Sequence, residues 1–128
     1  MIFIFFSNFT ENYCIMIDKK TFAENYEIFD KEIVKEIIDI YLQEYPDRII
    51  NLRTNIYQND FDSLYKNAHS FKGVTANFFD NQTVELARQL ETKGKEQDGT
   101  GLNELLELLK ESSENLIDEL KALAEEYS

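Results

Sequence analysis

Apolar residues recur at helical spacing over most of the chain. Between residues 61 and 78 they are separated by three or four positions, which places them on one face of an amphipathic helix. The members of this stripe are Phe61, Leu64, Ala68, Phe71, Thr75 and Phe78. Similar stripes lie between residues 30 and 45, 46 and 57, 84 and 94, and 102 and 127. The pattern predicts an all-α fold.

Short polar segments separate these stripes and set the expected topology. Candidate breaks are Pro46, Asn59-Asp60, Asp80-Asn81-Gln82 and the polar stretch from Lys93 to Gly101. Pro46 is expected to end one helix and to begin the next, because proline suits a first helical turn. The connection at Asp80-Asn81-Gln82 is so short that it implies antiparallel neighbours. We therefore expect an antiparallel up-and-down four-helix bundle over about residues 46 to 127, with an additional N-terminal helix, Asp30 to Tyr45, covering one end or side.

The last stripe carries a heptad pattern. Leucine occupies positions 102, 109, 116 and 123, and Leu106, Ser113, Leu120 and Tyr127 each follow four residues later. Such a seam suits a bundle core or a coiled coil. Because three other amphipathic helices need the same partner surface, we expect the core of a monomer.

The N-terminus differs from the rest. Residues 1–20 open with the apolar run Ile2 to Phe6, which lacks a positive flank and is too short for a signal peptide or a membrane span. Met16 directly precedes a more ordinary polar start. We divide the chain into an extension, 1–20, that either packs on the bundle or stays loose, and a helical domain, 21–128.

The composition and the net charge narrow the range of partners and compartments expected for the chain. The 128 residues suit one domain, and a net charge of −12 argues against nucleic acid and against anionic membrane surfaces as partners. Cys14 is the only cysteine, so no intramolecular disulfide can form. A reducing compartment, the cytoplasm, is expected.

The only histidine of the chain, His69, lies within the stripe from residue 61 to 78 but about 130° away from its centre. It should therefore face solvent. Lys66, Lys72, Gly73 and Ala76 lie on the same face within about two turns of it, and residues 63–79 contain no acidic residue. An accessible, locally positive surface is expected. A glycine inside a helix costs about 1 kcal/mol relative to alanine, so Gly73 indicates close approach by another molecule.

These residue types point to phosphoryl chemistry. A neutral imidazole is a nucleophile toward phosphorus, and nearby lysines favour the dianion that it would then carry. Asn67, Ser70 and Asn77 can either hydrogen-bond a phosphoryl oxygen or serve as ordinary polar positions. Arg88 and Glu91 of the following helix either border the site or form a surface pair.

The string Ala68-His69-Ser70-Phe71-Lys72-Gly73, continued by Ala76-Asn77 and followed by Leu90-Glu91, resembles the histidine phosphotransfer (HPt) domains of two-component relays. The resemblance implies that His69 accepts a phosphoryl group, that Lys72 supports the phosphorylated state and that Gly73 makes room for a receiver domain. Lys66, Ser70, Ala76 and Asn77 would complete the docking face. Two departures are Phe71, where leucine is usual, and Phe79-Asp80, where a small pair often ends the helix.

This resemblance implies a relay between the receiver domains of a hybrid sensor kinase and a response regulator. The chain needs no cofactor of its own, and the receiver is expected to supply Mg²⁺, because no metal-ligand cluster is evident in the sequence. No glycine-rich phosphate loop is present, so we expect a phosphoryl carrier without ATP-dependent kinase activity. The alternatives are a non-catalytic helical adaptor that binds a partner through the same face, and a small hydrolase using His69 as base.

Overall fold

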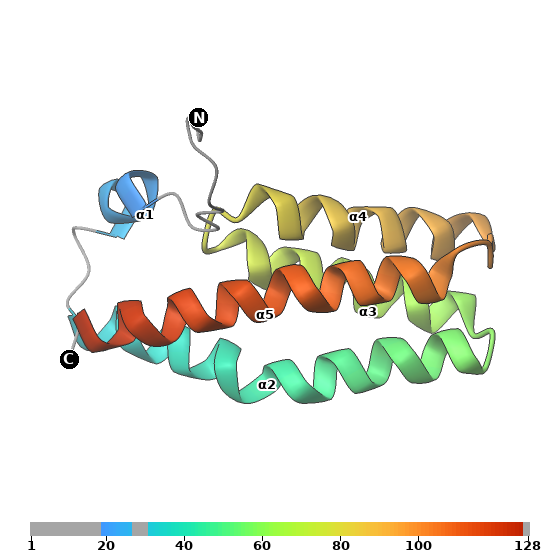
Figure 1. Cartoon of the computed structure of the whole chain (residues 1–128), viewed down its shortest axis with the longest axis horizontal. Helices are drawn as coiled ribbons and strands as arrows, with labels where there is room; N and C mark the ends of the chain where they lie inside the picture. The colour runs from blue at the N-terminus through green and yellow to red at the C-terminus, as the bar shows by residue number, and fades with distance from the viewer. Residues whose placement is uncertain (1–18, 27–30, 127–128) are drawn as a thin grey trace.

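The computed structural model describes residues 19–26 and 31–126, and within them the chain is helical without strands (Figure 1). The helices are α1 (Lys19–Tyr26), α2 (Lys31–Tyr57), α3 (Phe61–Ala76), α4 (Asn81–Glu96) and α5 (Leu102–Glu126). Helices α2 to α5 form an antiparallel bundle. Each packs on the next, and α5 returns to α2. The predicted fold class, a four-helix bundle with an additional N-terminal helix, is confirmed.

The predicted helix break at Pro46 is wrong, because α2 continues through it for 27 residues. Proline removes one backbone hydrogen bond and crowds the preceding turn, which costs about 3 kcal/mol inside a helix. Pro46 is exposed, so solvent can hydrate the carbonyl that it leaves unpaired. Tertiary contacts hold the helix on the N-terminal side of the proline: the hydroxyl of Tyr41 lies 2.8 Å from that of Thr75, and the hydroxyl of Tyr45 lies 2.8 Å from that of Ser113. The segment from Asp30 to Tyr45 is therefore assigned wrongly as a covering helix: its residues from Lys31 onward form the first half of a bundle helix, which changes direction along its length (Figure 1).

The covering helix is α1. Its Phe22 is 2% exposed and stacks on Phe78 with 6.3 Å between ring centroids. This contact joins α1 to the apolar cluster at one end of the bundle. Residues 1–18 lie outside the described residues, so the expectations for the N-terminal extension and its boundary at residue 20 stay predictions.

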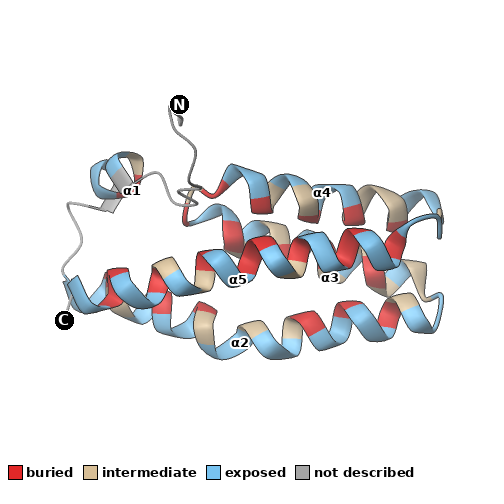
Figure 2. Ribbon diagram, in the orientation of Figure 1, coloured by how far each residue is buried: buried red, intermediate tan, exposed pale blue. Residues whose placement is uncertain are grey.

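Two apolar clusters fill the bundle, and Figure 2 shows the buried residues along the inward faces of the helices. One cluster lies near α1 and contains Phe22, Val34, Ile38, Tyr41, Phe78, Leu116, Leu120, Leu123 and Ala124. The other contains Leu52, Leu64, Ala68, Phe71, Ala87, Leu90, Leu102, Leu105, Leu106 and Leu109. The heptad leucines of α5 are thus internal, as predicted. In α2 the expected apolar stripe is altered, because Arg53 is exposed and Asn55 is buried.

Aspartates begin the two middle helices. The carboxylates of Asp60 and Asp80 accept hydrogen bonds from the backbone N–H of Ser63 and Thr83, at 3.1 Å in each case. Phe79, just before the second cap, has a φ of 60°, which is unusual for a bulky residue. The turn after Phe78, where the sequence departs from the HPt pattern, thus contains Phe79 in the left-handed conformation, followed by Asp80 as a buried N-cap.

Helix α4 extends further than the polar stretch from Lys93 suggested. It ends at Glu96, and the left-handed Gln97 follows as its C-cap. Gly94 lies on the buried face of α4, where an added Cβ would come within 2.7 Å of the backbone nitrogen of Tyr65. The glycine therefore lets α3 and α4 approach closely at this level.

Candidate functional site

His69 lies on the outer face of α3. Its side chain is 64% exposed, whereas Leu64, Ala68, Phe71 and Thr75 of the same helix are buried. The outward orientation predicted from the apolar stripe is confirmed. A second macromolecule can reach the imidazole without any opening of the bundle.

Glu91 of α4 holds the imidazole. Nδ1 of His69 lies 2.6 Å from Oε2 of Glu91, and Nζ of Lys72 lies 2.6 Å from Oε1 of the same carboxylate. The Glu91 side chain is only 13% exposed, so this carboxylate is largely shielded from water. One acidic side chain thus bridges the histidine and the lysine that the sequence singled out.

The charge state of Glu91 decides which ring nitrogen of His69 carries the proton. Burial alone would raise the pKa of Glu91, but hydrogen bonds from Lys72 and His69 outweigh burial and hold that pKa below its ordinary value. An ionised carboxylate only accepts hydrogen bonds, so Nδ1 of His69 must donate. In the neutral imidazole this leaves the lone pair on Nε2, so Nε2 is the ring nitrogen that is available to react.

The predicted positive surface around His69 is wrong. Although residues 63–79 contain no acidic residue, the fold brings Glu91 from α4 into contact with both His69 and Lys72. The other lysine of the face, Lys66, forms an exposed ion pair with Asp62, 3.0 Å away. Both lysines are therefore matched by carboxylates, one of them from a distant part of the sequence.

The remaining predicted site residues lie along the exposed ridge of α3. An added Cβ at Gly73 would meet no other atom within 4 Å, so this glycine has no packing role of the kind seen at Gly94. Ala76 and Asn77 are exposed further along the same ridge. Arg88 is instead held by Glu85, one turn back on α4, through its Nε at 2.9 Å and its second N–H group.

The sequence interpretation missed Arg48 of α2. Its guanidinium donates to Oγ of Ser70 at 2.9 Å and to Oε1 of Glu44 at 3.0 Å, which places a cation on the opposite flank of α3 from Glu91. Nothing in the local sequence indicated this contact, because Arg48 and Ser70 are 22 positions apart. Only the packing of α2 against α3 brings them together.

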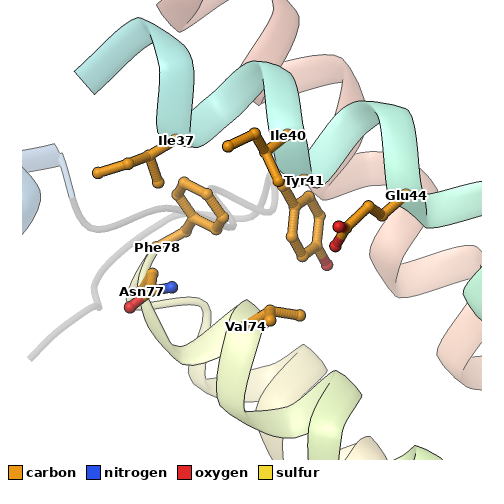
Figure 3. A pocket seen from close by; sticks show the side chains of 7 residues that line it. All are labelled: Ile37, Ile40, Tyr41, Glu44, Val74, Asn77 and Phe78. Atoms are coloured by element: carbon orange, nitrogen blue, oxygen red, sulfur yellow. The ribbon is translucent and has the colours of Figure 1, made fainter. Parts of the chain in front are cut away.

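A shallow apolar groove lies between the first half of α2 and the end of α3 (Figure 3). It measures about 130 Å³ and is lined by Ile37, Ile40, Tyr41, Glu44, Val74, Asn77 and Phe78. In Figure 3 these side chains face one another across the space between the two helices. A groove this small is below the usual size of a small-molecule site, about 300 Å³ or more. It suits an apolar side chain of a docked protein.

Metal and membrane signals are absent from the part of the chain that the structure describes. There, no three His, Cys, Asp or Glu side chains gather in a way that could hold a metal ion. No helix in residues 19–26 or 31–126 is long and apolar enough to cross a membrane.

Comparison with known proteins fits this exposed histidine on a four-helix bundle. The family profile described as the Hpt domain matches residues 36–126, well over half of the chain. The chain belongs to the Hpt domain family. The structure is also similar to the crystal structure of histidine-containing phosphotransfer protein B from Pseudomonas aeruginosa PAO1, with a TM-score of 0.82 and 18% sequence identity over 91% of this chain and 100% of that one. At this identity the likeness concerns the fold. No curated protein matches the sequence.

Membership in the Hpt domain family defines the role of the chain at a coarse level. The protein is a phosphotransfer component of two-component signalling, and its partners are receiver domains. Hpt domains carry phosphoryl groups and are not themselves kinases. The match includes α3, α4 and the whole of α5, so His69, Lys72 and Glu91 all lie within it.

Proposed function

We propose that His69 accepts a phosphoryl group from the aspartyl phosphate of one receiver domain and passes it to the aspartate of another. The observation that carries this proposal is the Nδ1 contact between His69 and Glu91, which leaves Nε2 as an exposed nucleophile. Lys72 and the ridge residues are proposed to serve the same reaction.

In the proposed reaction the lone pair of Nε2 attacks phosphorus in line with the aspartyl oxygen. The P–O bond to the receiver breaks, its electron pair returns to the aspartate carboxylate, and an N–P bond forms on His69. Positive charge develops on the imidazole in this step, and the carboxylate of Glu91 stabilises it through the N–H on Nδ1. The return of the phosphoryl group to a second receiver follows the same path in reverse.

Lys72 is proposed to stabilise the phosphorylated state. Its ammonium group is tied to Glu91 but remains 28% exposed, so it can turn toward a phosphoryl group on Nε2 while the imidazole keeps its own hydrogen bond. Catalysis of phosphoryl transfer rests mostly on positioning and charge. We propose that the receiver supplies Mg²⁺, and that this chain supplies the nucleophile, the lysine and the docking face, without ATP-dependent kinase activity.

We further propose that the receiver docks over the α2 flank of α3. The α4 flank is charged, with Glu91, Lys72, Arg88 and Glu85 tied in ion pairs. The α2 flank carries the apolar groove of Figure 3, and the exposed Gly73, Ala76 and Asn77 lead from His69 toward it. Because the heptad leucines of α5 are buried in the bundle, they leave no seam for a coiled-coil dimer, which supports a monomer.

The test is incubation of the protein with a receiver domain that has been phosphorylated by labelled acetyl phosphate. The residue of this protein that then carries the labelled phosphoryl group is identified. We expect acid-labile label on the wild type and none on His69→Gln, with unchanged helicity and melting temperature because His69 is exposed. Label on another residue of His69→Gln would overturn the assignment. Tight binding of the receiver without label would favour the adaptor function instead.

A further inference from the structure

Arg48 lies level with His69 on the neighbouring helix. Three side-chain contacts fix the alignment of the antiparallel helices α2 and α3: Tyr41 with Thr75 at 2.8 Å, Arg48 with Ser70 at 2.9 Å and Asn55 with Asn67 at 2.7 Å. As the position on α2 increases, the position on α3 falls. The middle contact joins Arg48 to the residue directly after His69, so the guanidinium flanks the proposed reaction centre.

The contacts of Arg48 do not use its full hydrogen-bonding capacity. Its side chain is 24% exposed, and its ionic partner Glu44 is 50% exposed on the same helix. Exposed ion pairs of this spacing are weak and easily exchanged. In the described part of the chain, Nε of Arg48 is the one buried side-chain nitrogen or oxygen without a hydrogen-bond partner. Nε is out of reach of a partner, but the N–H group that binds Glu44 lies in an exposed ion pair and can exchange Glu44 for another carboxylate.

Because the molecule is strongly acidic, a cation near His69 would help an acidic partner to dock there. The chain carries a net charge of −12, whereas a receiver presents an aspartyl phosphate and metal-binding carboxylates at its reacting face. Lys72 is bound to a carboxylate that is only 13% exposed, and Lys66 pairs with Asp62. Arg48 links His69 to the apolar groove, because it contacts Ser70, the residue next to His69, and its partner Glu44 lines that groove.

We propose that Arg48 is a specificity-determining contact for the receiver domain. On docking, its guanidinium exchanges the carboxylate of Glu44 for a carboxylate on the acidic rim of the partner's phosphorylation site, while the partner's apolar side chain enters the groove. Arginine suits this role because its planar fork binds carboxylates in two parallel hydrogen bonds. This inference rests on the proposed function and adds the residue by which the partner is recognised.

A purely structural role makes different predictions. If Arg48 only ties α2 to α3 through Ser70, its loss should lower stability and disturb His69 toward every phosphodonor. If it recognises the receiver, its loss should weaken the encounter alone. Arg53 provides the matched control: it is an arginine of the same helix that pairs with Glu107 of α5 at 3.2 Å, away from α3.

The experiment compares wild type, Arg48→Gln, Arg48→Lys and Arg53→Gln. The probes are phosphoramidate, which labels histidine without a protein partner, and the receiver domain of the source organism that labels the wild type fastest. With the receiver, we expect Arg48→Gln to raise the half-saturating receiver concentration about tenfold and to weaken its salt dependence, with the maximal rate unchanged. Arg48→Lys should recover part of the loss. Labelling by phosphoramidate and melting temperature should match the wild type, and Arg53→Gln should match it throughout.

Two results would overturn the assignment of Arg48. One is receiver-dependent transfer by Arg48→Gln that equals the wild type. The other is a loss that also appears with phosphoramidate or is accompanied by a lower melting temperature without rescue by lysine. Failure of phosphoramidate and receiver alike to label His69 in the wild type would instead refute the proposed function itself.

Discussion

At the scale of single residues, the site depends on the carboxylate of Glu91, which accepts hydrogen bonds from both His69 and Lys72. Glu91 accepts from His69 and Lys72 at 2.6 Å each, and its side chain is 13% exposed, against 64% for His69 and 28% for Lys72. A buried acceptor fixes the imidazole rotation more firmly than a solvated one would, because water competes less for the hydrogen bond. Sequence spacing could name all three residues but could not show that one of them joins the other two.

Replacement of Glu91 should therefore slow phosphorylation without unfolding the bundle. We expect Glu91→Gln to lower the rate of labelling by phosphoramidate about tenfold, since one charge-assisted hydrogen bond contributes about 1.5 kcal/mol and the amide no longer enforces a single imidazole tautomer. Nitrogen NMR of the imidazole should show a mixture of tautomers. Glu85→Gln is the control, because Glu85 occupies the same helix but pairs with Arg88. Equal rates for Glu91→Gln and wild type would show that Glu91 has no part in the reaction.

At the scale of elements, helix α2 shows how tertiary contacts override a local signal. Pro46 is a strong reason to end a helix, yet α2 spans Lys31–Tyr57. Its Tyr41 binds Thr75 of α3, and its Tyr45 binds Ser113 of α5. These contacts, together with the burial of Val34 and Ile38 at one end and Leu52 at the other, stabilise a single long helix.

The two helical glycines, Gly73 of α3 and Gly94 of α4, should respond in opposite ways to replacement by alanine. At Gly94 a Cβ would lie 2.7 Å from the backbone nitrogen of Tyr65 and 3.1 Å from the carbonyl of Phe61, so α3 and α4 must separate. We expect Gly94→Ala to lower the free energy of unfolding by about 1–3 kcal/mol, the usual cost of overpacking. Gly73→Ala meets open space and should raise it by up to about 1 kcal/mol. Urea unfolding measures both.

A larger side chain at Gly73 separates stability from function. Gly73→Gln should keep the fold, since nothing lies within 4 Å of an added Cβ, but should slow transfer from a receiver by obstructing its approach. If transfer is undiminished, the glycine does not serve close approach by a partner. For the other glycine, a Gly94→Ala protein as stable as the wild type would show that the contact between α3 and α4 is more adaptable than the structure indicates.

At the scale of the whole molecule, a buried polar network joins the turn between α3 and α4 to α5. Asp80 is 1% exposed and accepts hydrogen bonds from the backbone and the hydroxyl of Thr83, whose hydroxyl also lies 2.6 Å from that of Ser112 in α5. Burial, and to a smaller extent the charge of Glu119, raises the pKa of Asp80 to about 6, although hydrogen bonds from Thr83 act to lower it. The folded protein thus holds a proton on Asp80 more tightly than the unfolded chain does.

This linkage predicts a pH-dependent stability. The contribution of Asp80 is fully present below its ordinary pKa of 3.8 and is lost as the pH rises through about 6. Relative to Asp80→Asn, the wild type should gain about 2 kcal/mol in unfolding free energy when the pH falls from about 7.5 to about 4.5. Carboxylates distant from this site titrate alike in both proteins, so urea unfolding of the pair isolates Asp80 together with its neighbour Glu119. A constant difference between the two proteins would show that the pKa of Asp80 is not raised.

The sequence by itself determined the helical class, the antiparallel order, the inward faces of α3, α4 and α5 and the outward orientation of His69. These follow from periodicity within a helix and from short connections, which are local properties. The motif around His69 also sufficed to indicate the Hpt domain family, which the match over residues 36–126 confirms.

Only the tertiary structure decided that α2 continues through Pro46. It also decided that Glu91 pairs with His69 and Lys72, whose own segment, residues 63–79, lacks acidic residues. The positions of Arg48 and the groove beside α3 were likewise set by the tertiary structure. Each of these depends on how one helix packs against another, which joins residues 19 to 68 positions apart in the chain. Periodicity assigns a residue to a face, but it does not say which residue of the neighbouring helix lies opposite. That pairing is set by the packing of side chains across the whole core.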